Sequence, residues 1–142
     1  MIGFFEHQYL KFKKNHLKNL IALAKADGEI HELEEQLIYK AGHKYGLKDR
    51  QIESLLKSEE THVITVPENH NNRMNQLYDI MLMVYADGVV DDNEIEFCHD
   101  IVRTFGYKEG MVEWLIEKFA SDVTITPQEW DEAKMEAQRK FM

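Results

Sequence analysis

The chain has 142 residues, of which 44% are hydrophobic and 30% charged, a balance typical of a soluble globular protein. Its net charge of −9 argues against nucleic acid and anionic lipid, which need a positive face, and favours metal ions or basic protein surfaces. Seven Gly and two Pro are too few for an all-β sandwich, no apolar run is long enough to span a membrane, and the single cysteine, Cys98, predicts a reducing cytoplasm.

The second half of the sequence repeats the first. Residues 15–67 align without a gap with residues 75–127, and 12 of the 53 positions are identical, where chance gives roughly three or four. A unit of this length rarely buries enough apolar area to be stable alone. We therefore predict a single domain over residues 1–142, built from two copies of one unit.

Each copy predicts three helices. The first ends before an Asp-Gly turn, and in the second copy its residues 80–84 are apolar on every side, which is typical of a buried helix. The second helix ends at a glycine suited to a left-handed C-cap, and a shorter third helix follows. The matched boundaries are Ala26 and Ala86 at the end of the first helix, Ile30 and Val90 before the second, and Gly46 and Gly106 at its end.

An extended link closed by proline follows the third helix of each copy, at residues 62–66 and 122–126. Because proline is favoured at the first position of a helix, we expect new helices to begin at Pro67 and Pro127. A Thr-x-x-Glu capping box supports the second of these starts. The two links could instead pair as a very small sheet, without changing the class. The sequence predicts an all-α bundle of about seven helices.

Acidic residues concentrate at the turn between the first two helices of each copy, over Asp27–Glu34 and Asp87–Glu94. Both turns match the second half of an EF-hand calcium loop: an acid, a glycine, an aliphatic residue and a closing Glu. The oxygen ligands of the first half are missing, so a site would use fewer protein oxygens and more water. Oxygen ligands favour a hard divalent cation: calcium, magnesium or manganese. The candidate metal ligands are Asp27, Glu34, Asp87, Asp91 and Glu94.

The same residues also have a purely structural interpretation. The glycine would end one helix, and acids in the first turn of the next are favoured by its dipole by about 0.3–1 kcal/mol each. This explains Asp27 and Asp87 less well, because each follows the carboxyl end of a helix, where the dipole disfavours an anion. Both interpretations remain open.

The pattern Ala-Asp-Gly, an aliphatic residue and then Glu34 or Glu94, within a duplicated helical chain of this length, resembles the TerB-like family. That family is named for tellurite resistance, and its domain also occurs at the N-terminus of the DnaJ-like membrane cochaperone DjlA. The resemblance covers residues 15–141. It implies a seven-helix fold with two central buried helices, and acidic positions suspected of binding metal. These positions correspond to Asp27, Glu34, Asp87 and Glu94.

Two features limit what the resemblance implies. The first copy has His31 at the position where the second copy has the acidic Asp91, so the first site has one acidic ligand fewer. No J-domain is expected within these residues, so a cochaperone role does not transfer, and the negative charge would repel a tellurite anion.

We therefore expect a non-enzymatic cytoplasmic binding module that binds a divalent cation and docks a protein partner, in a stress or tellurite-resistance type of system. The alternatives are a structural adaptor without metal and a metal-dependent hydrolase. The sequence has no nucleophile elbow, phosphate-binding glycine loop or dinucleotide fingerprint. A basic, aromatic patch near the N-terminus, from Phe4 to Lys18, is expected to be a solvated helix face, although a partner could dock there.

Overall fold

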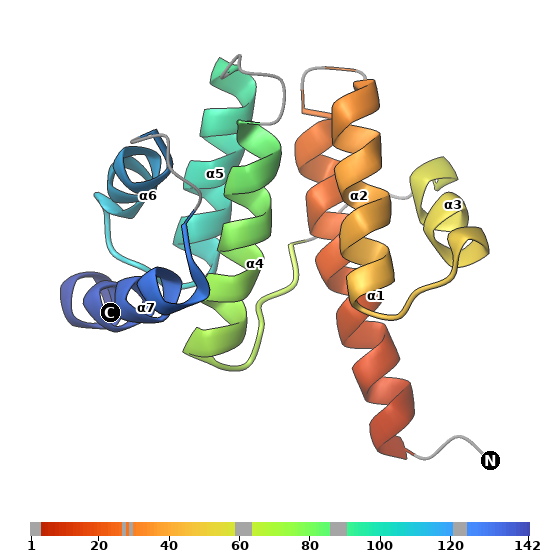
Figure 1. Cartoon of the computed structure of the whole chain (residues 1–142), viewed down its shortest axis with the longest axis horizontal. Helices are drawn as coiled ribbons and strands as arrows, with labels where there is room; N and C mark the ends of the chain where they lie inside the picture. Colours follow the sequence, from red (N-terminus) through yellow and green to blue (C-terminus); the bar gives the residue numbers. More distant parts are fainter. Residues whose placement is uncertain (1–3, 27, 29, 59–63, 86–90, 121–124) are drawn as a thin grey trace.

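The computed structural model describes residues 4–26, 28, 30–58, 64–85, 91–120 and 125–142. Within these ranges the chain forms seven helices and no strand, which confirms the all-α prediction (Figure 1). Residues 62, 63 and 122–124 of the links considered for a small sheet lie outside the described ranges. The helices are α1 (Phe4–Ala24), α2 (Glu32–Lys44), α3 (Asp49–Lys57), α4 (His70–Val84), α5 (Asp92–Thr104), α6 (Met111–Ala120) and α7 (Pro127–Phe141).

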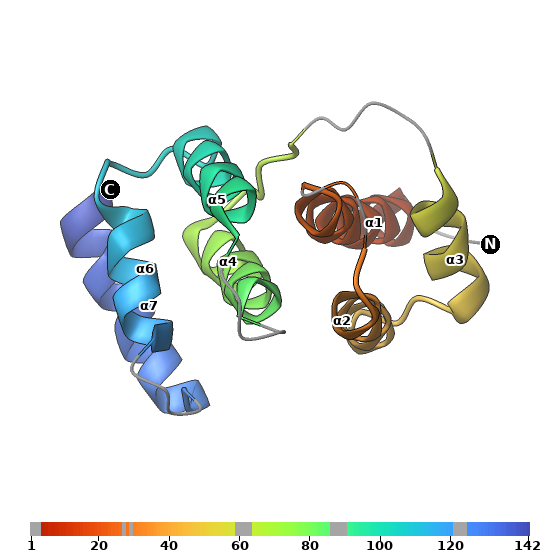
Figure 2. The same ribbon diagram turned by 90° about the horizontal axis from the view of Figure 1, so that it is seen from above.

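Two antiparallel helix pairs, α1 with α2 and α4 with α5, form the centre of the molecule (Figure 1). The pairs pack together through α1 and α4, which contact each other and most of the remaining helices. α3 covers the first pair on one side, and α6 and α7 cover the second pair on the other side (Figure 2). Because α1 and α4 run in the same direction, their carboxyl ends and the amino ends of α2 and α5 lie at one end of the molecule (Figure 1).

The hydrophobic core lies along α1 and α4. Leu17, Leu20 and Leu23 of α1 and Ile80 of α4 are at most 1% exposed. Burying a side chain of this size contributes about 1.5–3 kcal/mol. The expectation that residues 80–84 are buried on every side is wrong at one position. Leu82 is 39% exposed, because it lies at the edge of an open groove between α2 and α4.

α2 and α5 end at the predicted glycines, which have positive φ angles of 83° at Gly46 and 91° at Gly106. After Gly46, the amide of Leu47 donates a hydrogen bond of 2.9 Å to the carbonyl of Gly42, and Tyr107 makes the equivalent bond in the second copy. This is the Schellman motif, which satisfies the last carbonyl groups of a helix. Leu47 and Tyr107 are both buried and so fix the direction in which the chain leaves each helix.

The expected helix start at Pro67 is wrong, because α4 begins three residues later at His70. Its N-cap is Asn69, whose side chain accepts the amide of Asn72 at 2.8 Å. An asparagine N-cap satisfies an amide that the first helical turn leaves unpaired, which proline cannot do. Arg73 donates from Nε to the carbonyl of Pro67 at 2.9 Å and so ties the link to the helix.

The expected helix start at Pro127 is confirmed by α7. The amide of Glu129 donates to Thr126 Oγ1 at 3.1 Å, and the amide of Thr126 donates to Glu129 Oε1 at 3.2 Å, which completes the capping box. The predicted apolar stripe of this helix is largely buried. It consists of Trp130, Ala133 and Ala137, with Phe141 partly buried.

Glu136 of α7 gives a pH-dependent link to α6. Its carboxylate lies 2.9 Å from Lys140 Nζ and 3.1 Å from Lys118 Nζ. These hydrogen bonds lower the pKa of Glu136 from 4.5 to about 2, and the bond from Lys140 makes the largest contribution. Because the folded pKa lies below the unfolded one, the stabilisation is present above about pH 4.5 and is lost as the pH falls toward 2.

We expect Glu136→Gln to lower the free energy of unfolding by about 1 kcal/mol at neutral pH, since the partly exposed lysines are screened by solvent. Urea unfolding at neutral pH and at about pH 3 measures it, and the difference from the wild type should shrink at the lower pH. Glu132→Gln, an exposed change on the same helix, is the matched control. A difference that stays constant with pH would contradict the assignment.

Candidate functional site

The described members of the predicted ligand set lie at the amino ends of α2 and α5, at one end of the molecule (Figure 1). Glu34 is in the first turn of α2, Glu94 is in the first turn of α5, and Asp91 is the N-cap of α5. Asp27 and Asp87 lie outside the described residues. The structure therefore places three of the five predicted ligands.

Glu34 and Glu94 are only 2% and 6% exposed, although glutamate is rarely buried in proteins. Glu34 Oε1 accepts the backbone amide of His31, the N-cap residue, at 3.1 Å. Asp91 Oδ1 accepts the amide of Asn93 at 2.7 Å. Glu34 and Asp91 therefore take part in helix capping, which is what the structural interpretation of the acidic turns predicts.

The described residues alone contain no group of three or more His, Cys, Asp or Glu side chains arranged to hold a metal ion. A cation at either turn would therefore need Asp27 or Asp87 in addition to the carboxylates seen at the helix starts. The chemistry of such a set, carboxylate oxygens beside a glycine turn, suits calcium, magnesium or manganese.

Cys98 does not provide a nucleophile. Its side chain is 2% exposed, and burial, with a smaller contribution from the nearby charge of Glu94, raises the pKa of the thiol to about 12. The reactive thiolate is therefore negligible at neutral pH. Cys98 behaves as the small buried residue that its apolar neighbours in the sequence predict.

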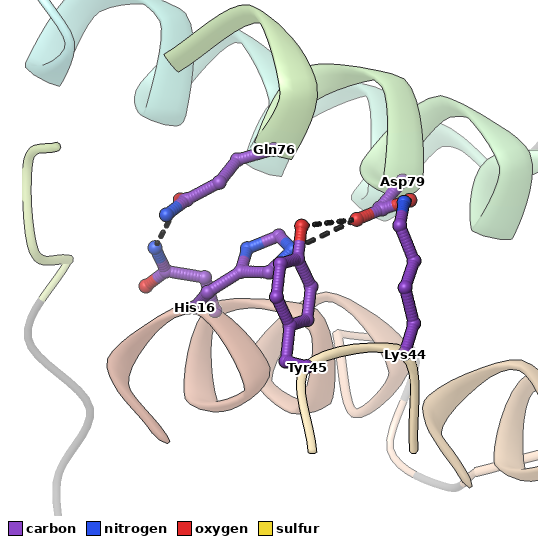
Figure 3. A network of polar contacts seen from close by, with 6 residues as sticks. His16, Lys44, Tyr45, Gln76 and Asp79 are labelled. Carbon is purple, nitrogen blue, oxygen red and sulfur yellow. Dashed lines mark hydrogen bonds and ion pairs between the residues drawn. The ribbon is translucent and has the colours of Figure 1, made fainter. Parts of the chain in front are cut away.

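A buried polar network that sequence analysis missed joins α1 to α4 (Figure 3). Its centre is Asp79 of α4, which accepts a 2.9 Å hydrogen bond from Nε2 of His16, a fully buried residue of α1. The hydroxyl of Tyr45, at the end of α2, donates to the same Asp79 oxygen at 3.2 Å. Lys44 Nζ lies 3.7 Å from the other oxygen. Asp79 thus connects three side chains from the first copy of the repeat.

A second polar pair lies beside this network. Asn19 of α1 and Gln76 of α4 are 0% and 3% exposed, and their side chains form a long hydrogen bond of 3.5 Å. In the alignment of the two copies, Gln76 is the counterpart of His16, and Asp79 is the counterpart of Asn19. Equivalent positions of the two copies are therefore paired crosswise, as across the interface of a symmetric dimer.

One feature of the sequence indicates these pairs. Polar residues interrupt the apolar faces of both central helices at equivalent positions, three residues apart. Buried polar groups need hydrogen-bond partners, so such matched interruptions predict contact between the helices. The positions are His16 and Asn19 in the first copy and Gln76 and Asp79 in the second.

A comparison of the chain with protein-family models, with curated proteins and with solved structures finds no match. No helix among the described residues has both the length and the apolar character that crossing a membrane requires.

Proposed function

We propose that this chain is a non-enzymatic cytoplasmic binding module, similar to the TerB-like family, that binds a divalent cation at its acidic turns and docks a protein partner. One observation carries this proposal: each copy has a buried glutamate in the helical turn that follows its acidic turn. These residues are Glu34 and Glu94, at equivalent positions of the repeat. Burying a carboxylate costs free energy unless charge or hydrogen bonds compensate. A hard cation at the turn would add to the compensation that the capping hydrogen bond of Glu34 already provides.

The distribution of the exposed acids supports a basic partner. Glu32 and Glu35 of α2 and Asp92 of α5 are exposed, and Asp91 is half-exposed beside them. We call these four residues the acidic end, since the helices that carry them begin at one end of the molecule (Figure 1). Opposite charges speed and orient association, so a partner with a basic surface is favoured.

Titrating the whole chain with calcium, magnesium or manganese tests the cation site. We expect saturable binding with a dissociation constant on the order of 0.1–1 mM, as for weak EF-hand sites. Calorimetry measures the affinity, and amide NMR shifts with calcium or magnesium should be centred on the amino ends of α2 and α5. The paired change Asp27→Asn and Asp87→Asn should weaken binding by at least about tenfold, since each turn loses an anionic ligand.

The chain offers a matched control for this test. Glu32→Gln with Asp92→Asn removes the same charge from the same end, again at positions related by the repeat, without touching the proposed ligands. Little change is expected for this pair. Equal weakening by both pairs would mean that the cation is attracted by the general field of the acidic end, and absence of binding would remove the cation site altogether.

A structural adaptor without metal is the second candidate, and the capping hydrogen bonds of Glu34 and Asp91 favour it. Under this alternative, Glu34→Ala and Asp91→Ala each lower the free energy of unfolding by about 1 kcal/mol through the lost cap. Thermal unfolding of the wild type with and without calcium distinguishes the two. The adaptor predicts the same midpoint in both conditions, whereas a bound cation raises it.

A further inference from the structure

An open groove between α2 and α4 lies over the buried network. It has a volume of about 220 Å³ and is mainly lined by apolar side chains. Leu20 and Met83 form its buried part, and Leu37, Tyr78 and Leu82 lie around them. An apolar cavity of about 150 Å³ is enough to bind benzene. The α2–α4 groove therefore has room for one aromatic or branched side chain of a ligand.

Apolar surface continues from the groove along α2. Leu33 is 48% exposed and stands four residues before Leu37, so the two lie on the same face of the helix. From Leu33 to Lys44 this face extends for about 16 Å at the helical rise of 1.5 Å per residue. That length suits an elongated ligand rather than a compact one.

The groove has a basic edge although the chain as a whole is acidic. Lys40 and Lys44 line it and stand four residues apart on α2. Lys40 is exposed and makes no ion pair within the described part of the chain. These two ammonium groups would attract an anionic ligand and repel a cationic one.

Asp79 also lines the groove but cancels this positive charge only in part. Its side chain is 9% exposed, and one of its oxygens is occupied by the buried His16 and by Tyr45. Lys44 is 58% exposed and lies 3.7 Å from the other oxygen, at the long end of the range for an ion pair. Its ammonium group is therefore accessible to a carboxylate from outside.

We propose that the α2–α4 groove binds an acidic amphipathic segment of a partner protein. The segment inserts one large apolar side chain between Leu37 and Leu82, and its carboxylates pair with Lys40 and Lys44. This recognition mode, in which an amphipathic helix lies in a groove, needs apolar anchors at helical spacing with charges beside them. It is independent of the proposed cation site, since none of the residues that line the groove is a proposed cation ligand.

A pair of synthetic peptides tests the proposal on the whole chain. The first is a helical peptide just longer than the groove, with Leu and Phe at positions i, i+3 and i+7 and Glu at the exposed positions; the second has Lys in place of every Glu. We expect the acidic peptide to shift the NMR amide signals of Leu37, Lys40 and Leu82, with saturation. The basic peptide should shift the residues of the acidic end instead, because the exposed carboxylates there attract it.

Two substitutions probe the two parts of the groove. Lys40→Glu should weaken binding of the acidic peptide by at least about tenfold. Leu82→Asp should have a similar effect, because it places a charge where the apolar anchor inserts. Lys108→Glu is the matched control, because it makes the same change of charge at another exposed lysine that has no ion pair in the described chain. It should weaken binding of the acidic peptide by less than about threefold.

Three results would overturn the proposal. The first is equal weakening by Lys40→Glu and Lys108→Glu, which would show that only net charge matters. The second is binding of the acidic peptide with shifts outside the groove, or no binding. The third is concentration-dependent dimerisation of the peptide-free chain with shifts at the same groove residues, which would identify a second copy as the occupant.

Discussion

Replacing Asp79 with alanine is expected to lower the free energy of unfolding by about 3 kcal/mol, which corresponds to a fall of about 6–12 °C in Tm for a domain of this size. The substitution leaves the buried His16 and the hydroxyl of Tyr45 without the acceptor they share. It also removes the carboxylate beside Lys44. Removing one partner from a buried polar network costs more than the net value of its bonds, because the remaining groups stay desolvated.

Chemical unfolding of two further variants shows whether this loss comes from the network. Asp79→Asn keeps an acceptor oxygen for His16 and Tyr45 but loses the charge, so we expect about half the effect of the alanine variant. Glu132→Ala removes an exposed carboxylate on α7 and should stay within about 0.5 kcal/mol of the wild type. If Asp79→Ala behaved like Glu132→Ala, the network would contribute nothing to stability.

Gly42→Ala in α2 is expected to lower the free energy of unfolding by about 1–2 kcal/mol, although alanine normally favours a helix over glycine by up to about 1 kcal/mol. A Cβ atom at this position would lie 2.5 Å from Cδ1 and 2.7 Å from Cγ1 of Ile52, a fully buried residue of α3. Thermal and urea unfolding measure the effect. A stabilised Gly42→Ala variant would contradict the close packing of α2 on α3.

The second copy of the repeat suggests a compensating change. Its residues matching Gly42 and Ile52 are Val102 and Val112, both buried, so the larger residue on α5 faces a smaller one on α6. Adding Ile52→Val to Gly42→Ala removes the Cδ1 methyl group at 2.5 Å but leaves Cγ1 at 2.7 Å, so it should recover part of the loss. Ile52→Val alone is the control and should cost about 1 kcal/mol, as expected for a small cavity.

Local sequence features predicted most of the fold. The glycines at positions 46 and 106 end α2 and α5 as expected, because a left-handed C-cap depends on a few neighbouring residues. The predicted start of α4 is wrong because both Pro67 and Asn69 are residues that favour a helix start. The preference of proline for the first helical position does not take into account the capping hydrogen bond of Asn69, which sets the start. The exposure of Leu82 could not be predicted, since hydropathy does not show how far apart two neighbouring helices stand.

The candidate site was predicted less completely. The buried position of Glu34 and its bond to His31 agree with the capping role inferred from spacing. The matched polar positions of the two copies indicate contact between the central helices, but the pairing of His16 with Asp79 depends on how those helices cross. The α2–α4 groove, likewise, arises only where two copies of the repeat meet.

The crosswise pairing on the central helices makes the two halves of the chain selective for each other. If two first halves from different molecules packed in this way, each His16 would lie opposite the Asn19 of the other molecule. Two second halves would likewise place each Gln76 opposite an Asp79. Only unlike halves bring an imidazole to a carboxylate. A pairing of like halves would lose this charge-assisted hydrogen bond, so it is less favourable than the pairing of unlike halves. Divergence of the copies at these positions thus discourages the association of like halves from neighbouring molecules during folding.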